Sequence, residues 1–378
     1  MSISQQQGQR FLYLDLFRGL GALIVVSTHV GNSALNSILH IKEIHYAVVD
    51  FFFVLSGFVA YESIKRMAEQ ANAQSGIANL IWKRFVRLWP MVFVVLAASL
   101  IYEVIRIIGG SLVDGSSQIS PFFGKPIWSW FVAVSLLQIS SRAAMTWAVP
   151  LWSLGALWWG TVATLISVKL FGLSRLWALI TLGFAFQALG FYLDNGWIEK
   201  NGVYFGFNAL GRAIVGICVG LLLRKWLNKN SFDLRATCAG LTILFVAGFT
   251  YLDKEFGFSA SFLASLVFVP LIVLLAQSNP VNPSVRVQRI CNFAGVVAFP
   301  IFAWHWLAIT VLENVFLRLP ESQMDVIGSF WPRYLLVLLT TLGFWKISTM
   351  FFEPVVERNL KSLGARYFEF ARTPASKI

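Results

Sequence analysis

Long apolar runs recur along this chain, and they constrain its fold more than any other feature. Runs of about 17–25 apolar residues have the length at which an α-helix crosses the hydrocarbon core of a bilayer. The sequence predicts ten such spans, near residues 11–30, 46–63, 88–105, 145–168, 176–193, 203–223, 236–252, 258–276, 292–313 and 334–352. The expected fold class is therefore an all-α integral membrane protein, a bundle of about ten transmembrane helices.

Composition supports the membrane class and excludes others. Of the 378 residues, 57% are apolar and 13% are charged, whereas a soluble domain has about 25% charged residues. The net charge of +12 does not indicate nucleic-acid binding, because the basic residues gather in loops rather than in a soluble patch with interleaved aromatics. The three cysteines, Cys218, Cys238 and Cys291, are scattered, so neither a disulfide framework nor a metal site is predicted. No cofactor is expected.

The basic residues also predict a topology. The run 126–139 has 14 residues, which is too short for a span and favours a re-entrant or interfacial helix. If this run is not counted as a span, and both chain termini are cytoplasmic, most of the 30 Lys and Arg fall on the cytoplasmic side. This is the distribution that the positive-inside rule requires. Counting it as a span would reverse that bias for everything after it. We expect residues 1–378 to form a single membrane domain with no separate soluble domain.

The first span, FLYLDLFRGLGALIVVSTHV, carries Asp15, Arg18 and His29. Arg18 and His29 are eleven residues apart, so they share one helical face and lie about 16 Å apart along the axis. His29 has the side chain best suited to a general base near neutral pH, although a lone histidine at this depth also fits a wetted interfacial position. Arg18 either pairs with Asp15 or grips an anionic group from the cytoplasmic side.

Other predicted spans contain further polar groups. Asp50 and Ser56 lie in the second span, Arg212 lies near the middle of the sixth, and His305 lies deep in the ninth between two tryptophans. Asp50 is expected to partner an interior histidine or arginine, or to sit at the helix end. His305 is either a functional residue or a structural one whose buried ring has all its hydrogen bonds satisfied. Since charges inside a bilayer are costly, these groups together predict a polar cavity within the bundle.

A basic stretch leads into the third span. In Trp82–Pro90, WKRFVRLWP, Arg84 and Arg87 share a helical face. The stretch is typical of a cytoplasmic anchor with an interfacial tryptophan. It also suits a site for phosphate groups at the cytoplasmic mouth of the bundle.

Six stretches follow one another along the chain: LDLFRGLGALIVVSTHV, DFFFVLSGF, KRFVRLWP, LWSLGALWWG with Trp152 and Ser153, AFPIFAWHWLAI and FFEPVVERNL. In this order they resemble the motifs of the acyltransferase 3 family of membrane acyltransferases. The chain departs from the family at Leu157, where a glutamate is usual three residues after the Trp-Ser-Leu motif.

The resemblance implies transfer of an acyl group, first of all acetyl, from cytosolic acyl-coenzyme A to a hydroxyl of a surface polysaccharide or lipid-linked sugar. It implies His29 and Arg18 as catalytic residues and Arg84 and Arg87 as donor-binding residues. Asp50, Ser56, Trp152, Ser153, Arg212 and His305 are expected around the acceptor or the cavity. The expected location is a bacterial inner membrane, and a homo-oligomer is compatible with the sequence. The alternatives are a transporter of an acyl donor or sugar-lipid, and a non-catalytic partner of polysaccharide export.

Overall fold

The computed structural model describes residues 11–30, 44–69, 73–114, 127–140, 147–193, 206–230, 232–256, 261–316 and 330–370. Within these ranges every regular element is helical, as the sequence predicts. The long helices are α1 (Leu12–His29), α3 (Ile44–Glu69), α4 (Ala73–Asp114), α7 (Trp152–Phe171), α8 (Leu176–Leu193), α9 (Gly206–Lys229), α10 (Arg235–Phe256), α11 (Ser261–Gln277), α12 (Val285–Phe316), α14 (Phe330–Ile347) and α15 (Glu353–Phe370).

A helix lies at each of the ten predicted spans: α1, α3, α4, α7, α8, α9, α10, α11, α12 and α14. Across the described ranges, seven helical segments are long and apolar enough to cross a membrane. The protein is therefore a multi-pass membrane protein. The apolar parts of α10 and α11, Arg235–Phe245 and Leu266–Gln277, are shorter, and α3 carries Asp50 together with charges from Glu62 onward. The count of ten spans stays a prediction.

Some element bounds differ from the predicted spans. The basic stretch Trp82–Pro90 continues into the third span as one helix, α4, although Pro90 lies inside it. Its 42 residues give a length of about 63 Å, well beyond the hydrocarbon core. The fourth span begins late, because Pro150 lies in a short 3₁₀ turn, η4 (Val149–Leu151), immediately before α7.

The run 126–139 forms a short helix, α5 (Ile127–Val134), followed by a turn and a 3₁₀ segment, η3 (Gln138–Ser140). Two indole N–H groups hold α5 against α4. Trp130 donates to the Leu96 carbonyl at 2.9 Å, and Trp89 donates to the Val134 carbonyl at 2.9 Å. Leu136 takes a left-handed backbone conformation with φ of 60°, which ends the helix. The prediction of a short helix here is confirmed.

Helix α9 packs most closely on α3, and small residues allow it. Gly216 and Gly220 lie four residues apart on one face of α9, where such spacing lets two membrane helices approach. A methyl group on Gly220 would overlap the Val54 carbonyl oxygen, and one on Gly57 would overlap the Ile217 carbonyl oxygen. The backbones of the two helices are therefore in direct contact.

Helix α1 lies along α12, and the first turn of α1 is tied to the connection before α12. A Cβ on Gly19 would lie 2.8 Å from the Ala294 Cβ, so this contact is also close. The Leu12 N–H, which has no partner inside the helix, donates to the Asn279 side chain at 2.7 Å. These contacts fix both the tilt and the axial position of α1 on α12.

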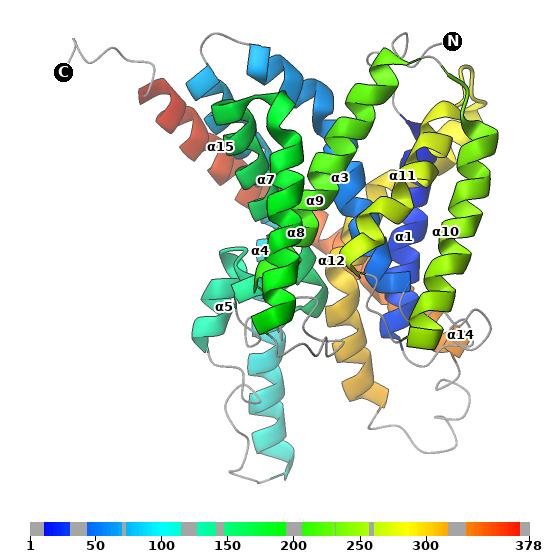
Figure 1. Cartoon of the computed structure of the whole chain (residues 1–378). Helices are drawn as coiled ribbons and strands as arrows, with labels where there is room; N and C mark the ends of the chain where they lie inside the picture. The colour runs from blue at the N-terminus through cyan, green and yellow to red at the C-terminus, as the bar shows by residue number, and fades with distance from the viewer. Residues whose placement is uncertain are drawn as a thin grey trace.

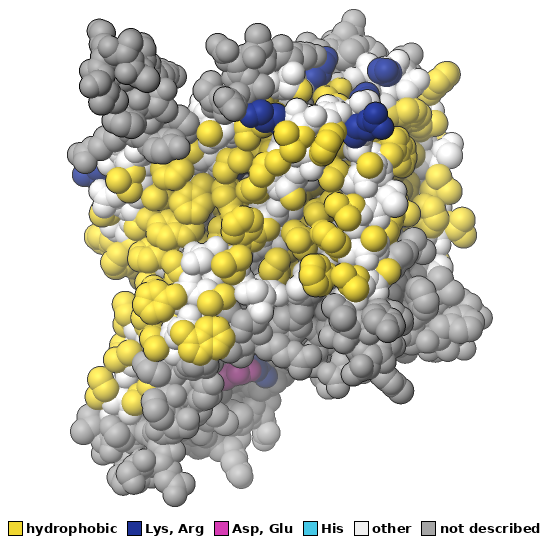
Figure 2. Space-filling model, turned by 60° about the vertical axis from the view of Figure 1, so that its left-hand side comes forward, with side chains coloured by type: hydrophobic (Ala, Val, Ile, Leu, Met, Phe, Trp, Pro, Cys, Tyr) yellow, Lys and Arg dark blue, Asp and Glu magenta, His cyan; other side chains and the backbone are white. Residues whose placement is uncertain are grey.

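The outer surface has the form expected of a bilayer protein. Figure 2 shows a broad apolar belt on one face, with Lys and Arg side chains gathered along its upper edge. In Figure 1 the helix α15 lies toward the same upper end, and the N-terminal end of α1 lies there too. Such an edge of basic residues is typical of the cytoplasmic interface.

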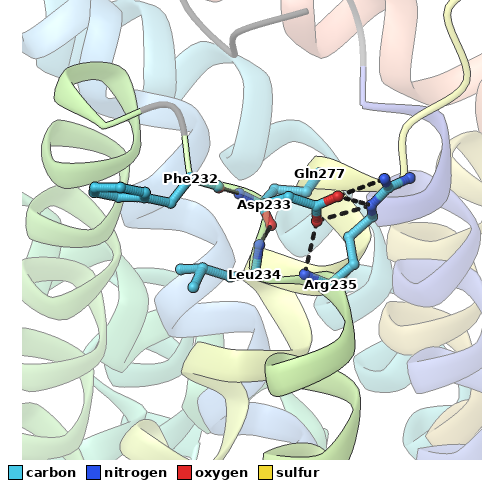
Figure 3. Close-up of polar contacts among 5 residues, drawn as sticks. All are labelled: Phe232, Asp233, Leu234, Arg235 and Gln277. Carbon is cyan, nitrogen blue, oxygen red and sulfur yellow. Dashed lines mark hydrogen bonds and ion pairs between the residues drawn. The ribbon is translucent and has the colours of Figure 1, made fainter.

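The connection between α9 and α10 is held by Gln277, the last residue of α11 (Figure 3). The Gln277 side chain accepts from the Leu234 N–H at 2.9 Å and donates to the Phe232 carbonyl at 2.7 Å. Beside it, Asp233 accepts hydrogen bonds from the Arg235 guanidinium, the shortest at 2.6 Å. These bonds lower the pKa of the Asp233 carboxyl to about 2, so this pair is charged at any physiological pH.

Candidate functional site

Two histidines from helices that are far apart in sequence meet inside the bundle. His29 is the last residue of α1, and His305 lies in the middle of α12. The Nδ1 atom of His29 lies 3.1 Å from the Nε2 atom of His305, and the ring centroids are 5.1 Å apart. His305 is fully buried, whereas His29 is half-buried. The close packing of α1 on α12 produces this contact.

An aromatic ring packs against each of the two histidines. The Trp306 ring meets the His29 ring edge-on at 5.5 Å, and the Phe302 ring meets the His305 ring at 6.1 Å. Phe302 also contacts Phe52 of α3 at 6.1 Å. Each imidazole therefore has a rigid aromatic ring packed against it.

Arg18 pairs with Asp15 on its own helix, one of the two alternatives that the sequence left open. Their closest charged atoms are 3.2 Å apart, and the Arg18 side chain is 27% exposed while that of Asp15 is 8% exposed. Asp15 is pressed against α12, where a Cβ on Gly295 would lie 2.9 Å from the carboxylate carbon. Arg18 thus keeps an accessible guanidinium next to a buried carboxylate. The unbroken helix between Arg18 and His29 preserves their predicted separation of about 16 Å.

Asp50 and Arg212 form an ion pair that joins α3 to α9. The guanidinium donates through Nη2 to Oδ2 at 2.7 Å and through Nε to Oδ1 at 3.2 Å, and both side chains are fully buried. The Arg212 guanidinium also lies 5.5 Å from the ring centre of Trp152 at the start of α7. The expectation that Asp50 partners an interior histidine or arginine is met by Arg212. The pair neutralises both charges inside the bundle.

The remaining predicted residues are Ser153 and Ser56, and Leu157 stands at the position of the family glutamate. Ser153 is buried and donates from Oγ to the Pro150 carbonyl at 3.1 Å. Ser56 is half-buried on α3. Leu157, at the position where the family usually has a glutamate, packs against the apolar cluster that includes Val49, Phe53 and Trp152.

Each polar residue that the sequence predicted for the interior has a partner: His29 meets His305, Arg18 pairs with Asp15, and Asp50 pairs with Arg212. The sequence predicted one shared polar cavity for Arg18, His29, Asp50, Arg212 and His305. The contacts join His29 to His305 and Asp50 to Arg212, and the shared cavity stays a prediction.

A groove of about 560 Å³ lies between the first half of α4 and α15. Its walls mix aromatic, basic and acidic side chains: Asn79, Trp82, Lys83, Val86, Arg87, Pro90, Glu353, Glu357, Lys361 and Gly364. Arg87 and Lys83 are exposed in it, whereas Arg84 is half-buried and lies outside its lining. Of the two predicted donor-binding arginines, the structure therefore places only Arg87 in this groove.

Sequence reasoning missed the contribution of α15 to the groove. Glu357 and Lys361 form an ion pair with a 2.6 Å contact between their charged atoms, and Glu353 accepts a hydrogen bond from Ser348 at 2.6 Å. Gly364 leaves room for the Trp82 indole. The Glu-Lys spacing of four residues indicates a helix with a charged face, but it does not indicate which helix covers that face.

Comparison with known proteins decides the family. A sequence profile described as an acyltransferase domain matches residues 11–349, nearly the whole chain. The chain belongs to the acyltransferase 3 family. Together with its apolar helices, this membership makes it a membrane acyltransferase.

One curated relative is also similar to part of the chain. It is "Protein 2 in picA locus" of Rhizobium radiobacter, which is 32% identical over 104 residues, 26% of this chain. The chain spans about half the length of that relative, 49%. No solved structure matches the chain.

Proposed function

We propose that this acyltransferase 3 protein moves an acyl group, first of all acetyl, from cytosolic acyl-coenzyme A to a hydroxyl group of a surface polysaccharide or lipid-linked sugar at a bacterial inner membrane. The observation that carries the proposal is the pairing of His29 with His305 at 3.1 Å in a member of this family. An imidazole held by a second group is the usual arrangement of a general base.

His29 is the proposed base. As the acceptor hydroxyl oxygen attacks the thioester carbonyl carbon, His29 takes the hydroxyl proton and a new C–O bond forms. Collapse of the tetrahedral intermediate breaks the C–S bond, and the imidazolium returns the proton to the departing thiolate. The products are an ester and free coenzyme A thiol, so His29 ends in its starting state.

The groove between α4 and α15 is the proposed entrance for the donor. Lys83 and Arg87 are exposed in it beside the Trp82 indole, which together suit phosphate groups and an aromatic base. Arg18 lies about 16 Å from His29 by the helix rise, nearer the end where α1 begins, and its side chain is partly exposed. The donor phosphates would then stay at the basic edge while the thioester reaches the histidines.

The acceptor is proposed to reach His29 from the opposite side of the membrane. His29 ends α1, and α1 begins at the end of the bundle where α15 lies (Figure 1). If that end is cytoplasmic, His29 lies nearer the external face, where a growing glycan is found.

Transfer can be measured in isolated membranes with labelled acetyl-coenzyme A and candidate glycans. In the wild type, label should enter the glycan as an ester. In His29→Ala the rate of label transfer should fall by about 10²–10⁴-fold, which is the usual contribution of a general base. Label transfer that persists in His29→Ala would remove His29 from this role. Uptake of labelled donor into vesicles without a new ester would indicate a transporter instead.

A further inference from the structure

Arg224, near the end of α9, has a buried guanidinium held between two aromatic rings. The residue is 4% exposed, and its Cζ atom lies 4.8 Å from the ring centre of Phe11 and 5.3 Å from that of Phe58. Among the described residues, no group accepts a hydrogen bond from its Nη1 atom. A guanidinium carries five N–H donors, and burying donors without an acceptor is costly. The donors of Arg224 therefore suit an acceptor from outside the described chain.

Glu62, one turn after Phe58 on α3, does not serve as that acceptor. Its carboxylate attracts Arg224 electrostatically, but its Oε1 atom accepts from the Asn228 amide at 2.8 Å. Within the described part of the chain, Glu62 and Arg224 form neither a hydrogen bond nor an ion pair. The faces of the two phenyl rings attract the cation, but they do not replace hydrogen-bond acceptors.

Helix α1 begins beside Arg224, and its first turn offers further donors. Phe11 is the residue before this turn, and its apolar side chain makes no capping bond. The Leu12 N–H donates to a side chain, whereas the N–H groups of Tyr13 and Leu14 have no acceptor among the described residues. An uncapped helix N-terminus carries a partial positive charge and favours an anion.

We propose that Arg224 and the first turn of α1 form a binding site for a phosphate group. The planar fork of guanidinium donors matches phosphate oxygens, and the N–H groups of α1 lie beside it. Asp15, the acidic residue of this turn, pairs with Arg18, which balances its charge. The site lies at the end of the bundle where α1 begins (Figure 1), the end at which Lys and Arg gather (Figure 2).

This site is distinct from the groove proposed for the donor. It is built from α1, α3 and α9, whereas the groove is lined by α4 and α15. It is therefore independent of the proposed function. A bound phosphate would supply acceptors to Arg224 and cap the helix that carries His29, so binding should stabilise the folded protein.

Purified protein in a neutral detergent tests the site with three probes: inorganic phosphate, dioleoyl phosphatidylglycerol, and dioleoylglycerol as the same lipid without a phosphate. Melting temperature reports stabilisation, and native mass spectrometry reports bound lipid. The melting temperature should rise with a phosphate-bearing probe and not with dioleoylglycerol. A rise with inorganic phosphate identifies a site for the free anion, and a rise with phosphatidylglycerol alone identifies a lipid headgroup. No rise with either phosphate probe would overturn the proposal.

Substitution of Arg224 locates the bound phosphate. Arg224→Met should abolish the stabilisation, and Arg224→Lys, which keeps the charge but loses the fork of donors, should raise the Kd by about tenfold or more. Arg235→Met is the matched control, because Arg235 is exposed and pairs with Asp233. It removes the same charge and should leave the Kd within about twofold. Equal affinities of Arg224→Met and the wild type would contradict the assignment.

Glu62→Gln distinguishes a phosphate site from a purely structural role of Arg224. If the phosphate binds at Arg224, loss of the competing carboxylate should lower the Kd by about threefold or more. If Arg224 only balances Glu62, the substitution should lower the melting temperature and leave the Kd unchanged. A Kd unchanged in both Glu62→Gln and Arg224→Lys would place the phosphate elsewhere, and these two variants decide the matter even if Arg224→Met does not fold.

Discussion

At the scale of single residues, the Asp50–Arg212 pair shows how this bundle tolerates charge. Both side chains are fully buried, and two hydrogen bonds of 2.7 and 3.2 Å join them. A buried pair of this kind contributes little net stability compared with apolar residues of the same volume, but removing one partner leaves the other charge uncompensated. The pair is best understood as a specific connection between α3 and α9.

Substitutions in this pair should be strongly non-additive. Asp50→Leu and Arg212→Leu should each lower the free energy of unfolding by about 3–5 kcal/mol, whereas the double substitution should recover most of that loss. Thermal unfolding of the purified protein in one detergent measures all three variants. A double variant as unstable as the sum of the single variants would contradict the interpretation of the pair as a mutually neutralising contact.

The two arginines near the start of α4 should differ in their effect on the donor. Arg87 is exposed in the groove and Arg84 lies outside its lining. Loss of a charge-assisted hydrogen bond to a phosphate should raise the donor KM by about tenfold or more in Arg87→Ala, with a much smaller change in Arg84→Ala. Initial rates at varied acetyl-coenzyme A check this. Equal effects of the two substitutions would place the donor elsewhere.

At the scale of elements, helix α9 is fixed because its glycines lie against carbonyl groups of α3. A Cβ on Gly220 would overlap the Val54 carbonyl, whereas one on Gly240 in α10 would meet nothing within 4 Å. The two helical glycines therefore respond oppositely to the same substitution.

Gly220→Ala should be destabilising by about 1–3 kcal/mol, since the added methyl forces the helices apart. Gly240→Ala, the matched control, should be neutral or stabilising by up to about 1 kcal/mol, because alanine is the better helix former. Unfolding midpoints of both variants in the same detergent are compared. If Gly220→Ala is as stable as Gly240→Ala, the two helices are not in direct backbone contact.

At the scale of the whole molecule, the predicted topology gives the two ends of the bundle different roles. Ten spans and cytoplasmic termini would place Phe232 on the inner side and Ile108, near the far end of α4, on the outer side. Both side chains are exposed, at 68% and 55%. The three cysteines of the chain are buried, so an introduced cysteine can be labelled selectively.

A membrane-impermeant maleimide added to intact cells should label Ile108→Cys and leave Phe232→Cys unlabelled until the membrane is opened. The labelled fraction is read by mass spectrometry. The reverse pattern would invert the orientation and would place the groove between α4 and α15 outside, away from cytosolic acyl-coenzyme A. Labelling of both variants in intact cells would rule out the ten-span arrangement.

The sequence by itself determined the helical class, the position of every long helix except α15 and the short helix at 127–134, because apolar runs of sufficient length have few alternatives in a bilayer. It also predicted Arg18, His29, Asp50, Arg212 and His305 as interior polar groups. Only the tertiary structure decided which of them meet. Residues 29 and 305 are far apart in the chain, and helical periodicity says which face a side chain shares but not which helix covers that face. For the same reason the sequence missed α15 as a wall of the groove. Helix packing through glycines and carbonyl groups makes those choices, and that packing is a property of the assembled bundle.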